Sequence, residues 1–211
     1  MLNALINPDG TVLRFINKLV SSVWLHILWF ICSIPIITIG PSTTALFYCC
    51  QKVANDEEGY ITKAFFHSFK SDFKQAVLIG LITTLLGIIF VIDGYVLYHL
   101  YSTSAFWTII TALFVVAVVA YIFVIMWIFP LLAHFENTTI AMFKNSMILS
   151  IRFLLCSVLM LAIYFAMLVI IIRFFTPAVI FGFGTCALLN SMLLKNIFIQ
   201  CEQNEINENK N

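Results

Sequence analysis

The sequence predicts an all-α integral membrane protein. It is expected to be a bundle of about five transmembrane helices, with an amphipathic cytoplasmic helix after the first span. Of its 211 residues, 62% are hydrophobic and only 10% are charged, whereas soluble domains are typically ~45–50% apolar and ~25% charged. A chain of this size cannot hide so much apolar surface inside a water-soluble core. Long uncharged stretches separated by short polar segments point to the lipid bilayer as its main surroundings.

The apolar stretches define a single transmembrane domain, residues 1–194. About 20 apolar residues cross the ~30 Å hydrocarbon core of a bilayer. The first stretch is too long for the apolar part of a signal peptide, so it is expected to be a retained span. The tail is rich in Asn and Glu and is expected to be disordered. The expected spans are residues 19–39, 77–100, 105–129, 147–172 and 177–194, and the expected tail is residues 195–211.

The first span ends in a segment that breaks a regular helix. Pro35, Gly40 and Pro41 lie within seven residues, and proline removes a backbone donor and clashes with the preceding turn. The short apolar stretch that follows, residues 42–53, is too short to cross the bilayer unaided. It is either an extension of the first span, a re-entrant half-helix or a sixth crossing.

Residues 61–74 have the periodicity of an amphipathic helix. Phenylalanines are expected on one face and cationic side chains on the other. The first set is Phe65, Phe66, Phe69 and Phe73, and the second is Lys63, His67, Lys70 and Lys74. Such a helix either anchors the second span at the membrane surface or docks a protein partner.

The Lys and Arg distribution predicts the orientation, because these residues are more frequent in cytoplasmic segments. Five spans place eight of them on one side and three on the other. The N-terminus is then outside and the C-terminus is cytoplasmic. If residues 42–53 form a sixth crossing, Arg14 and Lys18 join the larger group and the ratio becomes ten to one.

Three ionisable residues lie within or beside the spans, where charge is unfavourable. Asp93 in the second span either contacts a substrate or ion, or is a hydrogen-bonded carboxylate near the headgroups. His26 in the first span is either a proton relay or a donor between helices. Arg173 ends the fourth span, where it snorkels to the interface or pairs with Asp93.

The sequence lacks motifs that would indicate catalysis. It contains no nucleophile elbow, phosphate-binding loop, zinc-protease motif or paired carboxylates. Its six cysteines have no metal-ligand spacing, and its net charge of +1 gives no basic region for nucleic acid. The expectation is therefore a protein without enzymatic activity, cofactor, metal or nucleic-acid partner.

Three segments resemble a known family, the YesL-like membrane proteins of Gram-positive bacteria. They are the proline-rich stretch 28–46, the acidic turn 56–58 and the Phe/Lys stretch 65–76. The resemblance implies an uncharacterised multi-pass protein of the plasma membrane, often found with carbohydrate ABC importers. It implies no catalytic residues. The residues most typical of the pattern are Pro35, Thr38, Gly40, Pro41, Phe69, Phe73 and Lys74.

Two functions are therefore expected. The first is a non-enzymatic accessory or regulatory partner of a carbohydrate ABC importer. The pattern residues, with Phe65 and Lys70, would contact permease or ATPase subunits. The second is a small transporter or channel, with His26 and Asp93 lining a path. A permease would usually carry an E-A-A-x₃-G coupling loop, and the sequence has none.

Overall fold

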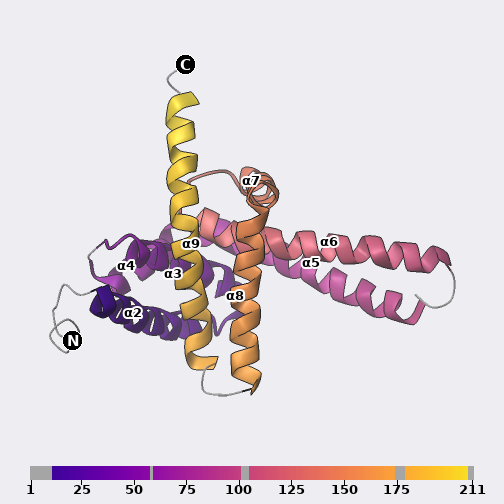
Figure 1. Ribbon diagram of the computed structural model, residues 1–211, viewed down its shortest axis with the longest axis horizontal. Coiled ribbons are helices and arrows are strands. Elements are labelled where there is room, and N and C mark those ends of the chain that lie inside the picture. The colour runs from indigo at the N-terminus through magenta and orange to yellow at the C-terminus, as the bar shows by residue number, and fades with distance from the viewer. Residues whose placement is uncertain (1–10, 58, 101–104, 174–178, 209–211) are drawn as a thin grey trace.

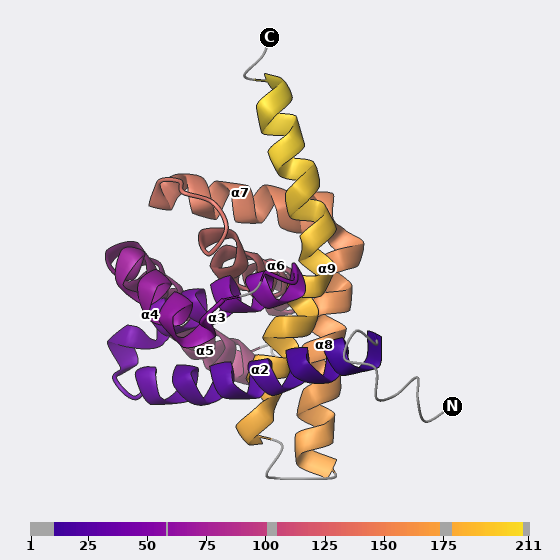
Figure 2. The same cartoon turned by 90° about the vertical axis from the view of Figure 1, so that its left-hand side faces the viewer.

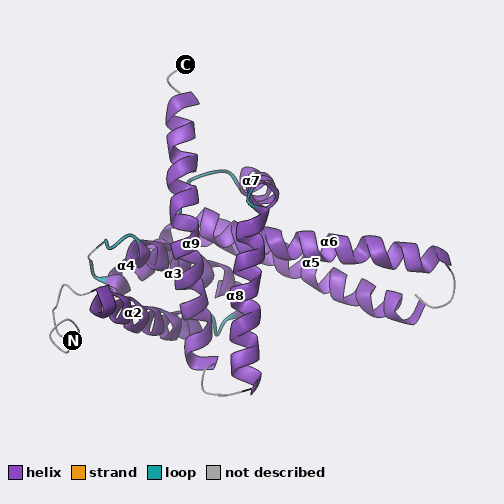
Figure 3. Cartoon of the chain, viewed as in Figure 1, coloured by secondary structure: helices purple, strands orange, loops and turns teal. Residues whose placement is uncertain are grey.

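The computed structural model describes residues 11–57, 59–100, 105–173 and 179–208. All regular structure in these ranges is helical, which confirms the predicted all-α class (Figure 3). The elements are α2 (Thr11–Cys32), the 3₁₀ helix η1 (Ile36–Thr38), α3 (Ile39–Ala54), α4 (Ile61–Ser71), α5 (Phe73–Leu100), α6 (Ala105–Leu132), α7 (Thr139–Arg152), α8 (Leu154–Arg173) and α9 (Val179–Glu208).

Four of the described helices are long and apolar enough to cross a membrane: α5, α6, α8 and α9. The apolar part of α2, Ile16–Cys32, is shorter. Large apolar side chains are exposed along α5, α6 and α8, as expected for helices surrounded by lipid rather than water. The chain is therefore a multi-pass membrane protein.

The four long helices form two hairpins that extend in different directions from a common centre (Figure 1). Helices α5 and α6 lie side by side and project away from the other elements, while α8 and α9 form the second pair. Helix α7 is seen end-on in Figure 1 and from the side in Figure 2, so it runs across both hairpins. Helix α2 runs across α9 in Figure 2 and packs against it.

Helix α3 occupies the centre of the molecule. It packs against α2, α4, α5, α6 and α9, and most of its residues are buried. Its 16 residues correspond to ~24 Å of helix. The stretch 42–53 is thus an interior helix that returns toward the end at which α2 begins.

Two clusters of buried apolar side chains share α9. The first joins α2, α3 and α4 through residues such as Leu25, Leu46 and Phe65. The second joins α5, α6, α7 and α8 around Trp127. Because α9 contributes Leu188 to the first cluster and Leu194 to the second, it connects the two halves of the core.

The structure corrects the expected end of the first span. Helix α2 ends at Cys32 instead of continuing to residue 39. Helical backbone angles are disfavoured at a residue that precedes a proline, and Pro35 lies three residues after Cys32. The Thr38 hydroxyl donates a hydrogen bond of 2.6 Å to the carbonyl of Cys32, which satisfies a backbone acceptor left free at the helix end.

The expected fourth span, residues 147–172, is divided in the structure. Helix α7 ends at Arg152 and α8 begins at Leu154, because Phe153 has non-helical backbone angles, φ −111° and ψ 48°. The Ser157 hydroxyl donates to the carbonyl of Ser150 across this break, at 3.0 Å. Residues 147–152 therefore belong to a separate helix.

The expected disordered tail is also corrected, since α9 continues to Glu208. Its extension is stabilised by Phe198, which is buried against the second cluster. Residues 209–211, the end of the expected tail, lie outside the described residues, as do residues 177 and 178 at the expected start of the fifth span.

Candidate functional site

His26 lies at the crossing of α2 and α9. The backbone N–H of Gly184 donates a hydrogen bond of 3.2 Å to the Nδ1 atom of His26. A side chain at Gly184 would clash with the carbonyl oxygen of Ser22, so glycine permits this close approach of the helices. The His26 ring also stacks on Trp29, with ring centres 5.4 Å apart. His26 therefore joins two helices.

Gly40 and Pro41 are buried, which corrects the expectation that they contact a partner protein. Gly40 lies against α5, where a Cβ atom would clash with the carbonyl oxygen of Ala76 and lie 3.4 Å from the Cα atom of Gly80. Pro41 falls in the first turn of α3, where a missing backbone donor is tolerated. Both residues serve the internal packing of α3.

The other pattern residues differ in exposure. Pro35 is exposed in the turn between α2 and α3, and Thr38 is partly buried there. Thr38 donates to the carbonyl of Cys32, as described above. Of these two, only Pro35 remains on the surface as a candidate contact.

Asp93 and Arg173 lie on different hairpins, α5–α6 and α8–α9 (Figure 1). Both side chains are exposed, and the described residues contain no ion pair between them. Asp93 lines an open apolar groove between α5 and α6 that also includes Trp107. Of the two alternatives for Arg173, the pairing with Asp93 is therefore not formed. His26 lies apart from both, where α2 crosses α9.

Helix α4 has one face fixed against the protein and one face exposed. Phe65, which was expected to contact a partner, is instead buried together with Ser68, and α4 packs on α3. The predicted amphipathic helix is thus confirmed, although it ends at Ser71 and Phe73 and Lys74 begin α5. Phe66 differs from the expectation: it is exposed, because adjacent residues of a helix point ~100° apart. We define the α4 basic face as the exposed Lys63, Phe66, His67, Lys70, Phe73 and Lys74.

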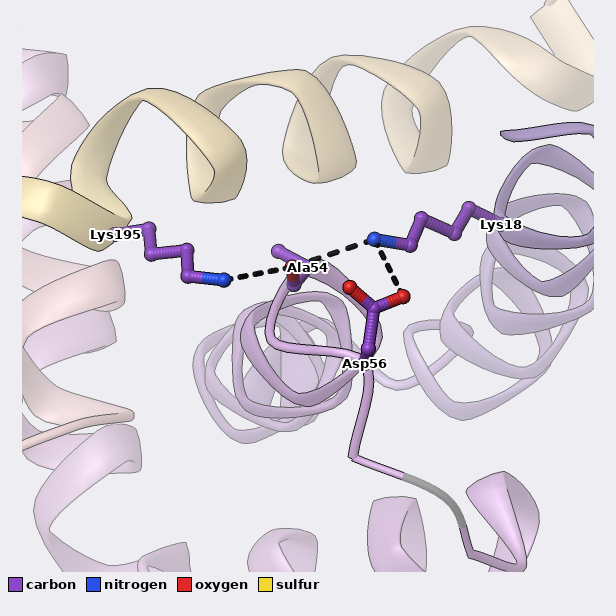
Figure 4. Close-up of polar contacts among 4 residues, drawn as sticks. All are labelled: Lys18, Ala54, Asp56 and Lys195. Carbon is purple, nitrogen blue, oxygen red and sulfur yellow. Dashed lines mark hydrogen bonds and ion pairs between the residues drawn. The ribbon is translucent and has the colours of Figure 1, made fainter. Parts of the chain in front are cut away.

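A polar cluster that the sequence did not predict lies at the C-terminal end of α3, between α2 and α9 (Figure 4). Lys18 of α2 and Lys195 of α9 both donate to the carbonyl oxygen of Ala54, each at 3.4 Å. The Lys18 ammonium also forms an ion pair of 2.9 Å with the Asp56 carboxylate. We call these four residues the lysine junction.

The turn after α3 explains why cations gather there. The N–H of Glu57 donates to the carbonyl of Lys52 and the N–H of Asp56 to that of Val53, the hydrogen bonds of a Schellman motif. Asp56 occupies its left-handed position, with φ 58°. Carbonyl groups at a helix C-terminus attract cations. The hydrogen bond from Lys18, with further attraction from Lys195 and Arg14, lowers the pKa of the Asp56 carboxyl from its ordinary value of 3.8.

The lysine junction was missed because its members lie far apart in the sequence. Lys18 and Lys195 belong to the first and last described helices. The only local signal is the Asn55-Asp56 pair, since both residue types tolerate left-handed backbone. Within the described ranges, His, Cys, Asp and Glu side chains form no group of three that would suit a metal.

Comparison with known proteins finds uncharacterised relatives and names no activity. Residues 22–94, from α2 into α5, match the model of a family described as a protein of unknown function, DUF624. Over 164 residues the chain is 27% identical to the uncharacterized protein YteU of Bacillus subtilis (strain 168), covering 75% of this chain and 72% of that protein. No solved structure matches the chain.

Proposed function

We propose that this protein is a non-enzymatic accessory subunit of a carbohydrate ABC import system, and that it binds its partner through the α4 basic face. The observation that supports the proposal is that α4 has one buried and one exposed side. One side of the helix is anchored on the central helix α3 by the buried Phe65, while the other side exposes aromatic and cationic groups together.

The charge of this face favours an acidic partner surface. Lys63, Lys70 and Lys74 are exposed. The one acidic residue between positions 61 and 74, Asp72, is partly buried and accepts hydrogen bonds from Ser68 and Ser71. Complementary charges guide association and determine orientation. Exposed aromatic side chains such as Phe66 provide the apolar contact that protein interfaces favour. Because α4 leads into α5 with only Asp72 between them, a bound partner would lie directly beside a membrane span.

The choice of a carbohydrate importer depends on the resemblance to YesL-like proteins. That resemblance includes residues 65–76, which contribute to both α4 and the start of α5. The family match at residues 22–94 covers the same segment. The segment that resembles other proteins is thus also the segment that forms the proposed docking surface.

The alternative of an independent transporter receives less support from the geometry. His26 is engaged in the contact between α2 and α9, and Asp93 lies on the separate α5–α6 hairpin. A transport path would need its polar groups to meet at one depth between helices. These two residues do not meet.

The proposal also fixes an orientation, with the lysine junction and the α4 basic face in the cytoplasm. The five-span arrangement needed Lys18 and Lys52 on opposite sides of the membrane. Lys18 instead pairs with Asp56, four residues after Lys52, so both lie at one end. This arrangement favours the ten-to-one division of Lys and Arg, with Arg173 alone outside.

Co-purification from native membranes tests the proposed function. Tagged wild-type protein is expected to recover the permease and ATPase subunits of a carbohydrate importer. The variant Lys63→Glu/Lys70→Glu/Lys74→Glu is expected to recover at least ten-fold less of these subunits, because it reverses the charge of the docking surface. Arg173→Glu, exposed at the end of α8 and outside this surface, serves as the charge-reversal control.

Thermal unfolding of both variants in detergent establishes that they are folded. Recovery of wild-type protein without importer subunits would overturn the proposal. Equal recovery by the triple variant would exclude the α4 basic face as the binding surface.

A further inference from the structure

Helix α7 exposes an apolar stripe, although it is not a spanning helix. Ile140, Met147, Ile148 and Ile151 are 83%, 57%, 49% and 64% exposed. The spacing of these residues places them along one side of the helix. In water such a stripe would be unfavourable, so its surroundings require an explanation.

The opposite side of α7 is buried against the rest of the protein. Met142, Ser146 and Leu149 are buried, and α7 packs closely against α6. The Ser146 hydroxyl donates to the carbonyl of Met142 at 2.7 Å, so no polar atom of this pair is left without a partner. The helix therefore presents its apolar stripe in a fixed direction, away from the core.

The position of α7 relative to the spans suggests what covers the stripe. Only Phe153 separates α7 from α8, which is long and apolar enough to cross a membrane. Helix α7 runs across both hairpins in Figures 1 and 2. Its 14 residues correspond to ~21 Å, too short for a ~30 Å core. Because α7 crosses the direction of α8, the span that directly follows it, α7 runs along the membrane surface where α8 crosses the bilayer.

The charges of α7 fit a phospholipid headgroup layer. Lys144 and Arg152 are both exposed, and residues 139–152 contain no Asp or Glu. Lys144 projects from the same side as the stripe, one turn from both Ile140 and Ile148. The Arg152 guanidinium lies 5.6 Å from the centre of the Phe153 ring. Long cationic side chains can extend to lipid phosphates while their stems remain in apolar surroundings.

We propose that α7 is an interfacial helix of the bilayer. Its stripe is inserted at the boundary between headgroups and acyl chains, and Lys144 and Arg152 are placed at the phosphates of anionic phospholipids. This surface is separate from the α4 basic face, and the inference does not depend on the proposed function. It replaces the assignment of residues 147–152 to a transmembrane span.

A site-directed fluorophore tests the inference. Cys32, Cys156 and Cys201 are only partly buried and are first replaced by alanine, while the buried Cys49, Cys50 and Cys186 are kept. Ile148→Cys is then labelled with an environment-sensitive nitrobenzoxadiazole probe. The full chain is reconstituted in vesicles of phosphatidylcholine and phosphatidylglycerol. The control site is Glu136→Cys, which is exposed before α7 begins.

The probe at residue 148 is expected to emit at shorter wavelength, with at least two-fold higher intensity than at residue 136. Nitroxide-labelled lipid should quench it at least twice as strongly. Similar emission and similar quenching by aqueous iodide at both sites would overturn the inference. Blue-shifted emission that lipid nitroxide does not quench would also overturn it, because a second copy of the chain would then cover α7.

Discussion

Gly40 shows how one missing side chain sets the spacing of two helices. Its Cα atom lies close to α5, where Ala76 and Gly80 complete a contact of small residues. Small residues let helix backbones approach closely in membrane proteins. The contact matters beyond this pair of helices because α3 is the centre around which five other α-helices pack.

Replacing Gly40 by alanine is expected to destabilise the protein by ~1–3 kcal/mol, the usual effect of overpacking a close contact. The new Cβ atom would meet the backbone oxygen of Ala76, which cannot move as freely as a side chain. Thermal unfolding in detergent measures the effect. Gly59→Ala is the matched control, because a Cβ atom there meets nothing within 4 Å. Equal losses of stability in the two variants would contradict the assigned role of Gly40.

The sequence identified several important residues but not their roles. Gly40 and Pro41 stood out by their pattern, yet a pattern does not distinguish a docking surface from an internal contact. His26 stood out as a polar group in an apolar helix, and the acceptor role of its Nδ1 atom depends on α9, 158 positions away. Side-chain roles that depend on distant segments were beyond local reasoning.

At the scale of elements, the break between α7 and α8 is held by a buried hydrogen-bond chain. The indole N–H of Trp127 donates to the Ser157 hydroxyl at 2.8 Å, and this hydroxyl donates to the Ser150 carbonyl across the break. One serine thus links α6, α7 and α8. No proline or glycine marks this break in residues 147–157, which is why hydropathy predicted a single continuous helix.

Ser157→Ala is expected to lower stability by ~1–3 kcal/mol, because it leaves the buried indole N–H and the Ser150 carbonyl without this partner. The variant Trp127→Phe removes the indole donor instead. In a double-mutant cycle, the two changes together should destabilise the protein by less than the sum of the single effects. Additive effects in chemical denaturation would indicate that the two side chains are not coupled.

Hydropathy predicted the all-helical class well and the element boundaries less well. The spans α5 and α6 were recognised because they are long and uninterrupted. Helix α3 was ambiguous because a helix buried in protein and one buried in lipid are equally apolar. The extension of α9 was missed because its polar composition conceals the buried Phe198.

At the scale of the whole molecule, the lysine junction connects the first part of α2 to α9 at Lys195. These two segments therefore lie at the same end of the molecule. Both ends of the described chain are therefore expected on the cytoplasmic side, with the α5–α6 connection outside. Green fluorescent protein fused to either terminus should fluoresce in bacterial cells. Alkaline phosphatase fused after Leu100 should be active. An active phosphatase fused at the N-terminus would contradict this orientation.

Lys18 and Lys195 both donate hydrogen bonds to the carbonyl oxygen of Ala54. This contact between an early and a late helix has a consequence for biosynthesis. The ribosome makes α2 and α3 first and α9 last, yet both early helices pack extensively against α9. The apolar cluster that includes Leu25 and Ala45 lacks Leu188 and its other α9 members until the last helix emerges. Helices α2 and α3 must therefore be shielded by lipid or by the insertion machinery until α9 has been synthesised. Their native packing is completed only then.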